Sequence, residues 1–268
     1  ERKEGRKILD IDVVSFYPNL SIQNGIKPKH LGEKFLEVYN NIFQERRKIP
    51  KKDPINYVYK IILNSAYGLS KEKNSFLYDP AFTFGITING QLSLLMLIEM
   101  LVTRIPDVKL LQANTDGVSI DHDERYTDQI KAIFREWEAI TKLQLEEATY
   151  KSMVIKDVNN YIAIYDDPNK EAKKKGMFET TLDYHKNPSF LVIPKALEAY
   201  FVYGKDYKQY VYNHEDIFDF FAGVKKKSNF KLNLYKIIGG EVVKESQQKV
   251  TRFFVSNNGG GQLFKEFT

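Results

Sequence analysis

The stretch Gln112-Ala113-Asn114-Thr115-Asp116-Gly117-Val118 is a short polar turn between two apolar runs, residues 108–111 and 118–120. Asn, Asp and Gly tolerate the backbone of a tight hairpin turn, so the pattern predicts strand, turn and strand. A turn of this composition needs no function to explain it. It nevertheless places one carboxylate, that of Asp116, at the junction of two strands, where it could hold a metal ion.

A second carboxylate is expected at the end of another strand. Apolar and polar residues alternate over residues 7–15, so Asp10 and Asp12 share one face of a strand. Pro18 cannot continue a central ladder, which leaves Asp12 near the end of the strand. There its carboxylate could hold a divalent ion together with the carbonyl group of Val13, while the following amides approach a phosphate. An ordinary aspartate at a strand end is the alternative interpretation.

Two helices are predicted between this strand and the hairpin. Apolar residues recur every three or four positions over residues 31–49, which indicates an amphipathic helix. Asp53-Pro54 is a typical helix start, with an N-cap acceptor followed by a proline in the first turn. This second helix is expected to stop at Gly68. The two helices would form an antiparallel pair with a cluster of basic residues, 46–52, at its tip.

The second of these helices carries the stretch Lys60-Ile61-Ile62-Leu63-Asn64-Ser65-Ala66-Tyr67-Gly68. Its spacing places Lys60, Asn64 and Tyr67 on one side of the helix. A lysine suits a triphosphate as a point charge, an asparagine can hydrogen-bond, and a tyrosine offers a flat face to a base. A partly exposed helix face is the alternative, but the Asn-Ser pair lowers helix propensity without an evident structural gain.

The rest of the chain adds helices and strands. Helices are predicted from Asn89 or Gly90 to Arg104 and over about residues 126–141, and strands at 153–155, at 161–165 and around Met177. The part after Leu182 is expected to be mostly helical, with a short β-like piece at 250–255. The order of strand, helices, hairpin, helix and strands predicts an α+β fold with an antiparallel sheet.

The composition limits the classes of function. The chain has 268 residues, 43% of them hydrophobic, and it carries a net charge of +5 with a pI near 9.0, which suits a polyanionic partner. It has no cysteine, which excludes disulfides, thiolate metal sites and cysteine nucleophiles and fits an intracellular setting. The longest apolar run, residues 92–102, is interrupted by Glu99 and is shorter than a membrane span, so no membrane is expected as a partner.

Three segments together resemble the polymerase core of family B DNA polymerases, in particular the compact viral or mobile-element members. Residues 12–18, Asp-Val-Val-Ser-Phe-Tyr-Pro, are similar to the family's Asp-x-x-Ser-Leu-Tyr-Pro motif. Residues 60–68 match Lys-x-x-x-Asn-Ser-x-Tyr-Gly in full. The stretch 112–117 resembles Tyr-x-Asp-Thr-Asp-Ser, with Gln112 in place of the tyrosine, Asn114 in place of the first aspartate and Gly117 in place of the serine.

The resemblance implies DNA-directed DNA polymerase activity by two-metal phosphoryl transfer, in which dNTPs are added to a primer 3′ end. The cofactor would be two Mg²⁺ ions, with Mn²⁺ as a possible substitute. Asp12 and Asp116 would be the catalytic residues and, with the carbonyl group of Val13, the metal ligands. Asn114 replaces the carboxylate that the family engages less directly with metal, so activity is expected to survive this departure.

Contacts with the nucleotide follow from the same resemblance. Ser15 and Phe16 would flank the triphosphate through backbone groups, and Tyr17 would pack under the deoxyribose and block a 2′-hydroxyl. Lys60 would contact the phosphates, whereas Asn64 and Tyr67 would lie beside the nascent base pair.

Basic residues of the first helical pair and several later residues complete the implied site. Arg47 and Lys51 have the four-residue spacing of the family's basic fingers residues, with Arg46 and Lys48 as competitors for these roles. The residues implied to contact DNA are Gly68, Thr115, Lys156, Tyr161 and Lys175. Of these, Tyr161 ends a stretch similar to a Lys-rich family motif, and Lys175-Gly176 resembles a Lys-Gly pair, for which a loop turn is the alternative.

The implied domains are a palm over residues 1–30 and 69–184, short helical-hairpin fingers over 31–68, and a mainly helical thumb, or part of one, over 185–268. A proofreading exonuclease domain is expected to be absent from this chain.

Primer-template DNA and dNTPs are the implied partners, with a separate exonuclease domain or a processivity factor as further candidates. The implied location is cytoplasmic, in a bacterium or in the host of a phage or mobile element. Two other functions remain open: a related palm polymerase that makes or copies RNA, and a degenerate palm that serves as a nucleic-acid-binding module.

Overall fold

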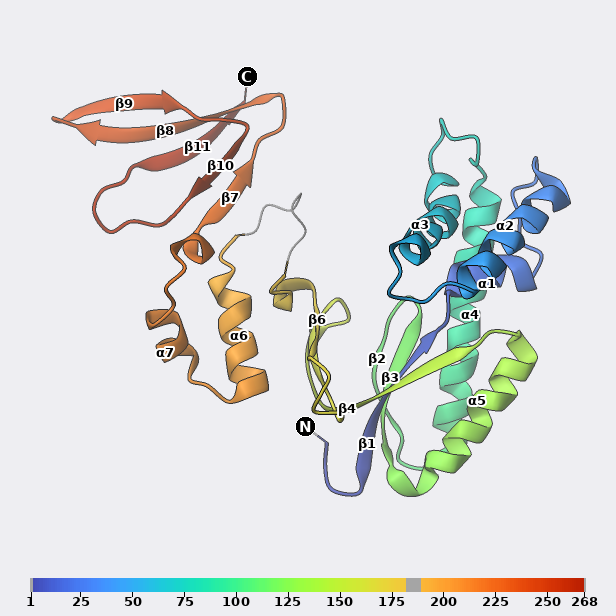
Figure 1. Ribbon diagram of the computed structural model, residues 1–268. Coiled ribbons are helices and arrows are strands. Elements are labelled where there is room, and N and C mark those ends of the chain that lie inside the picture. Colours follow the sequence, from blue (N-terminus) through green and yellow to red (C-terminus); the bar gives the residue numbers. More distant parts are fainter. Residues whose placement is uncertain (1, 182–188, 268) are drawn as a thin grey trace. The chain divides into compact units, whose positions relative to one another are not determined.

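The computed structural model describes residues 2–181 and 189–267, so the boundary expected at residues 184 and 185 lies outside the described residues. The described part is a mixed α+β fold with seven α-helices and eleven strands, which confirms the predicted class (Figure 1). Six strands form an antiparallel sheet, curled into a half-barrel, in the order β2-β3-β1-β4-β5-β6. They are β1 (Arg6–Val13), β2 (Lys109–Ala113), β3 (Gly117–Asp123), β4 (Leu145–Asp157), β5 (Asn160–Tyr165) and β6 (Lys173–Lys175).

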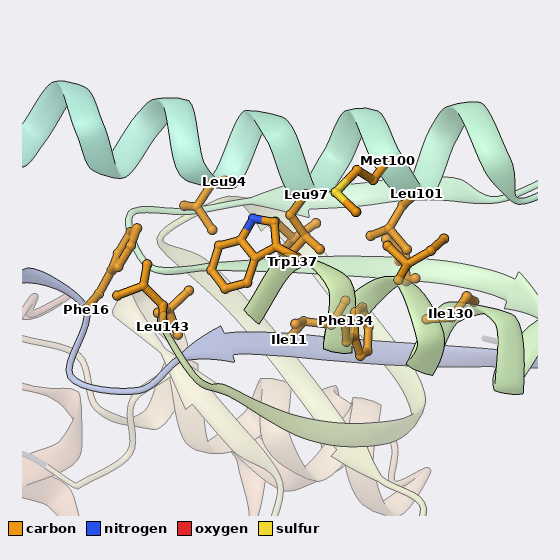
Figure 2. Packing of buried hydrophobic residues seen from close by; sticks show 14 of the residues in the cluster. Ile11, Phe16, Leu94, Leu97, Met100, Leu101, Ile130, Phe134, Trp137 and Leu143 are labelled. Atoms are coloured by element: carbon orange, nitrogen blue, oxygen red, sulfur yellow. The ribbon is translucent and has the colours of Figure 1, made fainter. Parts of the chain in front are cut away.

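Strand β1 is central, because it pairs with β3 on one side and with β4 on the other. Its alternation is the one predicted: Leu9, Ile11 and Val13 are buried in the main hydrophobic core. Helices α4 (Pro80–Arg104) and α5 (Thr127–Thr141) supply most of the other core residues. Figure 2 shows Trp137 of α5 packed below α4, and its indole Nε1 donates to the carbonyl oxygen of Ser93 at 2.9 Å.

Helix α4 begins about ten residues before the start expected at Asn89 or Gly90. Asp79 is its N-cap and accepts a hydrogen bond from the Phe82 amide at 3.0 Å, and Pro80 opens the first turn. Its 25 residues are long and apolar enough to cross a membrane by length and composition, which the 92–102 run alone is not. In its most apolar stretch of 18 residues, 28% is buried. The buried residues of α4 pack in the main hydrophobic core.

A short helix, α1 (Phe16–Gln23), follows β1 where the sequence predicts only the end of a strand. Pro18 lies in its first turn, where its missing N–H removes no helical hydrogen bond. Ser15 precedes the helix with φ 46° and ψ 51°, a left-handed conformation that is unfavourable for a residue with a side chain.

Helices α2 (Gly32–Arg47) and α3 (Pro54–Leu69) confirm the predicted pair. Asp53 caps α3 as predicted, accepting from the Ile55 amide at 2.8 Å, and the helix continues past Gly68 by one residue. The pair has a small core of its own, where the buried Tyr39 hydroxyl donates to the Leu63 carbonyl oxygen at 2.6 Å. The helices are therefore held together both by packing and by a buried hydrogen bond.

The C-terminal part is not mostly helical, which corrects the sequence prediction. It has two helices, α6 (Val192–Tyr203) and α7 (Tyr207–Tyr212), followed by β7 (Ala222–Lys225), β8 (Phe230–Ile238), β9 (Glu241–Ser246), β10 (Val250–Phe253) and β11 (Gln262–Phe267). The described strands pair as β10-β7 and β11-β8-β9. The sequence signal for this β-structure is the Gly239-Gly240 turn between alternating runs.

By internal contacts the chain divides into two compact units, residues 1–153 with 165–170 and residues 154–164 with 171–268. All residues of the cavity described next belong to the first unit.

Candidate functional site

The two predicted carboxylates meet at one end of the β1–β3 pair. Asp12 lies opposite Gly117 in the strand register, and the Val13 amide donates to the Asp116 carbonyl oxygen at 2.7 Å. The turn between β2 and β3 is fixed by Asn114, whose side-chain oxygen accepts from the Asp116 amide at 3.1 Å. Asp12 is half-buried and Asp116 is exposed. The sequence therefore places both carboxylates at the same corner of the sheet, as predicted.

A cavity of about 520 Å³ opens at this corner. It is lined by groups from β1 and α1, from the α2–α3 pair, from the β2–β3 turn and from the start of β4. Its lining residues are Val13, Val14, Ser15, Phe16, Tyr17, Pro18, Arg46, Lys51, Lys60, Asn64, Tyr67, Thr115, Asp116 and Glu146. Four parts of the chain that are far apart in the sequence thus converge on one space.

The N-terminus of α1 forms one wall of this cavity. The first amides of a helix have no intrahelical acceptor, and here they belong to Phe16 and Tyr17. The positive end of the helix dipole and such amides favour an anion. The ring of Phe16 is buried in the main core, so this residue offers its backbone rather than its side chain. The contact of the Ser15 and Phe16 backbone with a phosphate stays a prediction.

Arg46, rather than the predicted Arg47, reaches the cavity. Its guanidinium donates to the hydroxyl of Ser15 at 3.0 Å and to the side-chain oxygen of Asn56 at 3.1 Å. Burial lowers the pKa of Arg46 from its usual value. Arg47 instead lies over the ring of Phe43, 5.9 Å from its centroid, and is not part of the cavity lining.

Lys60, Asn64 and Tyr67 of α3 line the cavity together, as their spacing predicts. The Tyr67 ring lies 4.5 Å from that of Tyr17, and its hydroxyl forms a hydrogen bond of 2.9 Å with Thr87. Burial raises the pKa of Tyr17. Burial also acts to raise the pKa of Tyr67, but hydrogen bonds with Thr87 and Lys71 outweigh it, so this pKa lies below its usual value. The two rings are tilted by 56° and pack against each other at the cavity.

Glu146 is a cavity residue that the sequence analysis missed. It is directly opposite Asp12 in the pairing of β1 and β4, so the two side chains share a face of the sheet. Its carboxylate forms an ion pair with the ammonium group of Lys51, a predicted nucleotide-binding residue. The sequence prediction begins this strand at residue 153, whereas in the structure it begins at Leu145. Glu146 therefore lies outside the predicted strand, and its pairing with Asp12 was not anticipated.

A buried polar network supports the same face of the sheet. Asp10 is 3% exposed and accepts hydrogen bonds from the Ser119 hydroxyl at 2.5 Å and from the Tyr150 hydroxyl at 2.8 Å. Ser119 lies on β3 and Tyr150 on β4, so this carboxylate links the three strands that carry Asp12, Gly117 and Glu146. Asp10 thus shares a face with Asp12 but is enclosed, which suits a structural role.

The remaining predicted residues lie in different places. Thr115 lines the cavity, whereas Gly68 is exposed near the end of α3 and is not part of the lining. Lys156, Tyr161 and Lys175 belong to the second unit. There Tyr161 pairs with Lys175 across β5 and β6, and its side chain is only 3% exposed. The structure therefore brings Tyr161 and Lys175 together but encloses the tyrosine ring.

The chemistry of the cavity suits a divalent cation bound to a phosphate. Mg²⁺ prefers hard oxygen donors, which Asp12, Asp116 and the Val13 carbonyl provide. The ion commonly takes few protein ligands and completes its coordination shell with substrate oxygens and water. In the described ranges, 2–181 and 189–267, no group of three or more His, Asp or Glu residues is arranged to hold a metal by itself. Arg46, Lys51 and Lys60 supply positive charge in the lining of the same cavity.

Comparison with known proteins does not assign the chain. No protein-family model matches its sequence, and no curated protein matches it either.

Proposed function

We propose that this chain is the polymerising core of a DNA-directed DNA polymerase similar to family B enzymes. The observation that carries the proposal is the convergence of three separate sequence motifs on one cavity, which is lined by Asp116, Lys60, Asn64 and Tyr67. Asp12 lies beside the lining residue Val13, opposite Gly117 in the strand register. The proposed substrates are a primer 3′ end on a template and an incoming dNTP. The finer assignments of palm, fingers and thumb are part of this proposal.

In the proposed reaction, Asp12, Asp116 and the Val13 carbonyl would hold two Mg²⁺ ions, for which Mn²⁺ could substitute. Bound there, such ions lower the pKa of a primer hydroxyl and neutralise the charge of the phosphates. Arg46, Lys51 and Lys60 would hold the triphosphate by charge-assisted contacts, since all three side chains border the cavity. The free amides at the start of α1 would donate hydrogen bonds to a phosphate oxygen as a further anchor.

Tyr17 and Tyr67 would select the sugar and the base. Their rings pack against each other, 4.5 Å between centroids, beside the cations that line the cavity. A 2′-hydroxyl on the incoming nucleotide would need room beside these rings, so deoxyribonucleotides are favoured over ribonucleotides. A palm polymerase that makes or copies RNA is the alternative, and it predicts ribonucleotide incorporation at a comparable rate.

The experiment that tests the proposal is primer extension by this chain with Mg²⁺ and, separately, with Mn²⁺. Asp12→Asn and Asp116→Asn should each lower the rate by at least about 100-fold, because the ions lose a charged ligand. Both variants should still bind primer-template DNA. Asp128→Asn is the matched control, since Asp128 is an exposed carboxylate in the first turn of α5, outside the cavity.

Primer extension by the unmutated chain and by Asn114→Asp separates the proposal from a degenerate palm. Asn114 fixes the turn through the Asp116 amide, and an aspartate can accept the same hydrogen bond. We expect the variant to retain primer extension. Binding of DNA without extension in the unmutated chain under either metal would instead support a nucleic-acid-binding module.

A further inference from the structure

The region from Ala222 onward is a strongly basic β-structure. Residues 222–267 contain nine Lys or Arg residues against three Glu residues and no Asp, so their positive excess is larger than the +5 of the whole chain. These residues form the two small sheets, β10-β7 and β11-β8-β9 (Figure 1). The charge is therefore concentrated in one part of the second unit.

A cleft of about 770 Å³ in this region is lined by residues of both sheets. Leu232 and Leu234 of β8 and Leu263 of β11 form its apolar floor. Phe254 is 59% exposed, and its ring is stacked on that of Phe221, with 5.5 Å between centroids and 25° between planes. One aromatic face is thus supported from behind by a second ring and lies at an open cleft.

Cations border the cleft, whereas acidic residues do not. Arg252 and Lys265 are exposed lining residues, and within 2–181 and 189–267 neither forms an ion pair. Lys236 also lines the cleft and is paired with Glu245 at 3.0 Å. Glu266 projects from the other face of β11, where it binds Lys244 and Asn233. No acidic residue is among the described lining residues.

Exposed aromatic faces among unpaired cations are the means by which proteins bind single-stranded nucleic acid, because bases stack on the rings while the cations contact phosphates. A duplex keeps its base faces inside its own stack and could use only the cations. A membrane-binding surface inserts apolar side chains from one face of a helix or from a protruding segment, whereas the apolar residues here line a hollow.

We propose that this cleft binds single-stranded nucleic acid, with a base stacked on Phe254 and backbone phosphates at Arg252 and Lys265. The inference goes beyond the proposed polymerase activity and does not depend on it, since binding here involves neither the Asp12 corner nor a nucleotide triphosphate. A strand held in this cleft would be bound without regard to its sequence, since every base has a face that can stack.

The test measures binding of a fluorescein-labelled oligothymidylate to the full chain by anisotropy, with EDTA and without nucleotide. Phe254→Ala should weaken binding roughly ten-fold, as expected for the loss of one stacked base. The Arg252→Gln/Lys265→Gln variant should also weaken it, and should reduce the slope of log affinity against log salt by about 1.4.

Two control substitutions change the same residue types on the opposite faces of these strands. Phe264→Ala removes an exposed ring of β11 that packs edge-on against Tyr235, and Lys231→Gln removes an exposed cation of β8. Neither residue lines the cleft, so neither variant should change the affinity by more than about two-fold.

Cross-linking locates the bound strand independently. An oligonucleotide containing 5-iododeoxyuridine should cross-link, on irradiation, within residues 252–254. If Phe254→Ala lowers the melting temperature, Phe254→Tyr keeps an aromatic ring at this position and should retain binding. The Arg252→Gln/Lys265→Gln variant then still tests the proposal, because both replaced side chains are exposed and their loss should not affect folding.

The proposal is overturned if cleft and control variants bind equally, or if cross-links map only outside residues 221–265. It is also overturned if duplex DNA competes as well as the single strand, or if the cleft variants lose only binding to phosphatidylserine vesicles. Primer extension by the same variants separates the two proposals: a chain that binds oligothymidylate in this cleft but never extends a primer contradicts only the polymerase function.

Discussion

The Asp12 carboxylate occupies the space that a side chain at Gly117 would need. A Cβ atom at residue 117 would lie 2.2 Å from Oδ1 of Asp12 and 2.7 Å from the carbonyl oxygen of Ile11. The carboxylate could rotate away, but the backbone of β1 could not move without disturbing its pairing with β3 and β4. Glycine at this position therefore allows the strand ends to approach and keeps Asp12 at the cavity corner.

Gly117→Ala should displace Asp12 and slow primer extension by at least about ten-fold, with a loss of about 1–3 kcal/mol in the free energy of unfolding from overpacking. Extension kinetics and thermal melting measure the two effects. Gly68→Ala is the control for stability, because nothing lies within 4 Å of a Cβ there. Unchanged extension by Gly117→Ala would contradict a catalytic position for Asp12.

Arg46 and Arg47 are neighbours in sequence with different surroundings, so they form a matched pair of substitutions. Arg46→Gln should raise the KM for dNTP about ten-fold, because charge-assisted hydrogen bonds to a phosphate are lost. Arg47→Gln should change it by less than about two-fold, because Arg47 lies over Phe43 outside the cavity lining. A larger rise in the KM for dNTP with Arg47→Gln than with Arg46→Gln would indicate that Arg47, not Arg46, contacts the triphosphate.

Lys51 must leave Glu146 before it can hold a phosphate. Both side chains are largely exposed, and exposed ion pairs contribute about 0.2–1 kcal/mol. Glu146→Gln should therefore lower the KM for dNTP by up to about five-fold, since it frees Lys51 at little cost.

The double variant Lys51→Gln/Glu146→Gln isolates this competition. In the Lys51→Gln background, Glu146→Gln should leave the KM for dNTP unchanged. A fall in kcat with a higher Mg²⁺ requirement would show instead that Glu146 acts on the metal side of the cavity, beside Asp12.

The elements that the sequence predicts correctly have complete local signals. Asp53-Pro54 starts α3, and the 114–117 turn closes the β2–β3 hairpin, within a few residues each. Asp79-Pro80 carries the same start signal as Asp53-Pro54 and marks the true beginning of α4. The early part of that helix was missed because the strongest apolar run begins only at Leu92.

The parts of the site that sequence reasoning missed depend on long-range packing. Glu146 reaches the cavity through the pairing of β1 with β4, which no local pattern contains. Arg46 and Arg47 differ by about 100° around the axis of α2, and contacts with Asn56 and Ser15 decide which one faces the cavity. Three motif residues on one helix face, by contrast, needed only the helical period to be placed together.

Tyr150→Phe should lower the free energy of unfolding by about 1.5–3 kcal/mol, because the buried Asp10 carboxylate loses a hydroxyl donor. Tyr165 provides the control, since its ring packs against Tyr150 at 5.0 Å and is only partly buried. Tyr165→Phe should cost less than about 0.5 kcal/mol. Denaturant unfolding measures both, and a loss for Tyr150→Phe no larger than that for Tyr165→Phe would contradict stabilisation by the hydrogen bond to Asp10.

Asp79 should make part of the stability of the first unit depend on pH. The backbone amide of Lys29 donates to its carboxylate at 2.7 Å, which lowers the pKa of Asp79, and the Phe82 amide adds to this shift. A carboxyl group with a lowered folded-state pKa stabilises the fold fully above its unfolded pKa of about 3.9. That contribution is lost as the pH falls through the folded-state value.

Asp79→Ala should therefore lower the free energy of unfolding by about 1–2 kcal/mol at pH 7, from loss of the α4 cap, and by less at pH 3. Asp79→Asn keeps a capping oxygen without a titrating group, so it should retain most of the stability at pH 7 and lose less on acidification. Thermal melting of the three proteins between pH 3 and 7 measures the difference. A deficit of Asp79→Ala that stays constant over this range would contradict the role of the Asp79 charge, because an uncharged cap would be equally effective at both ends.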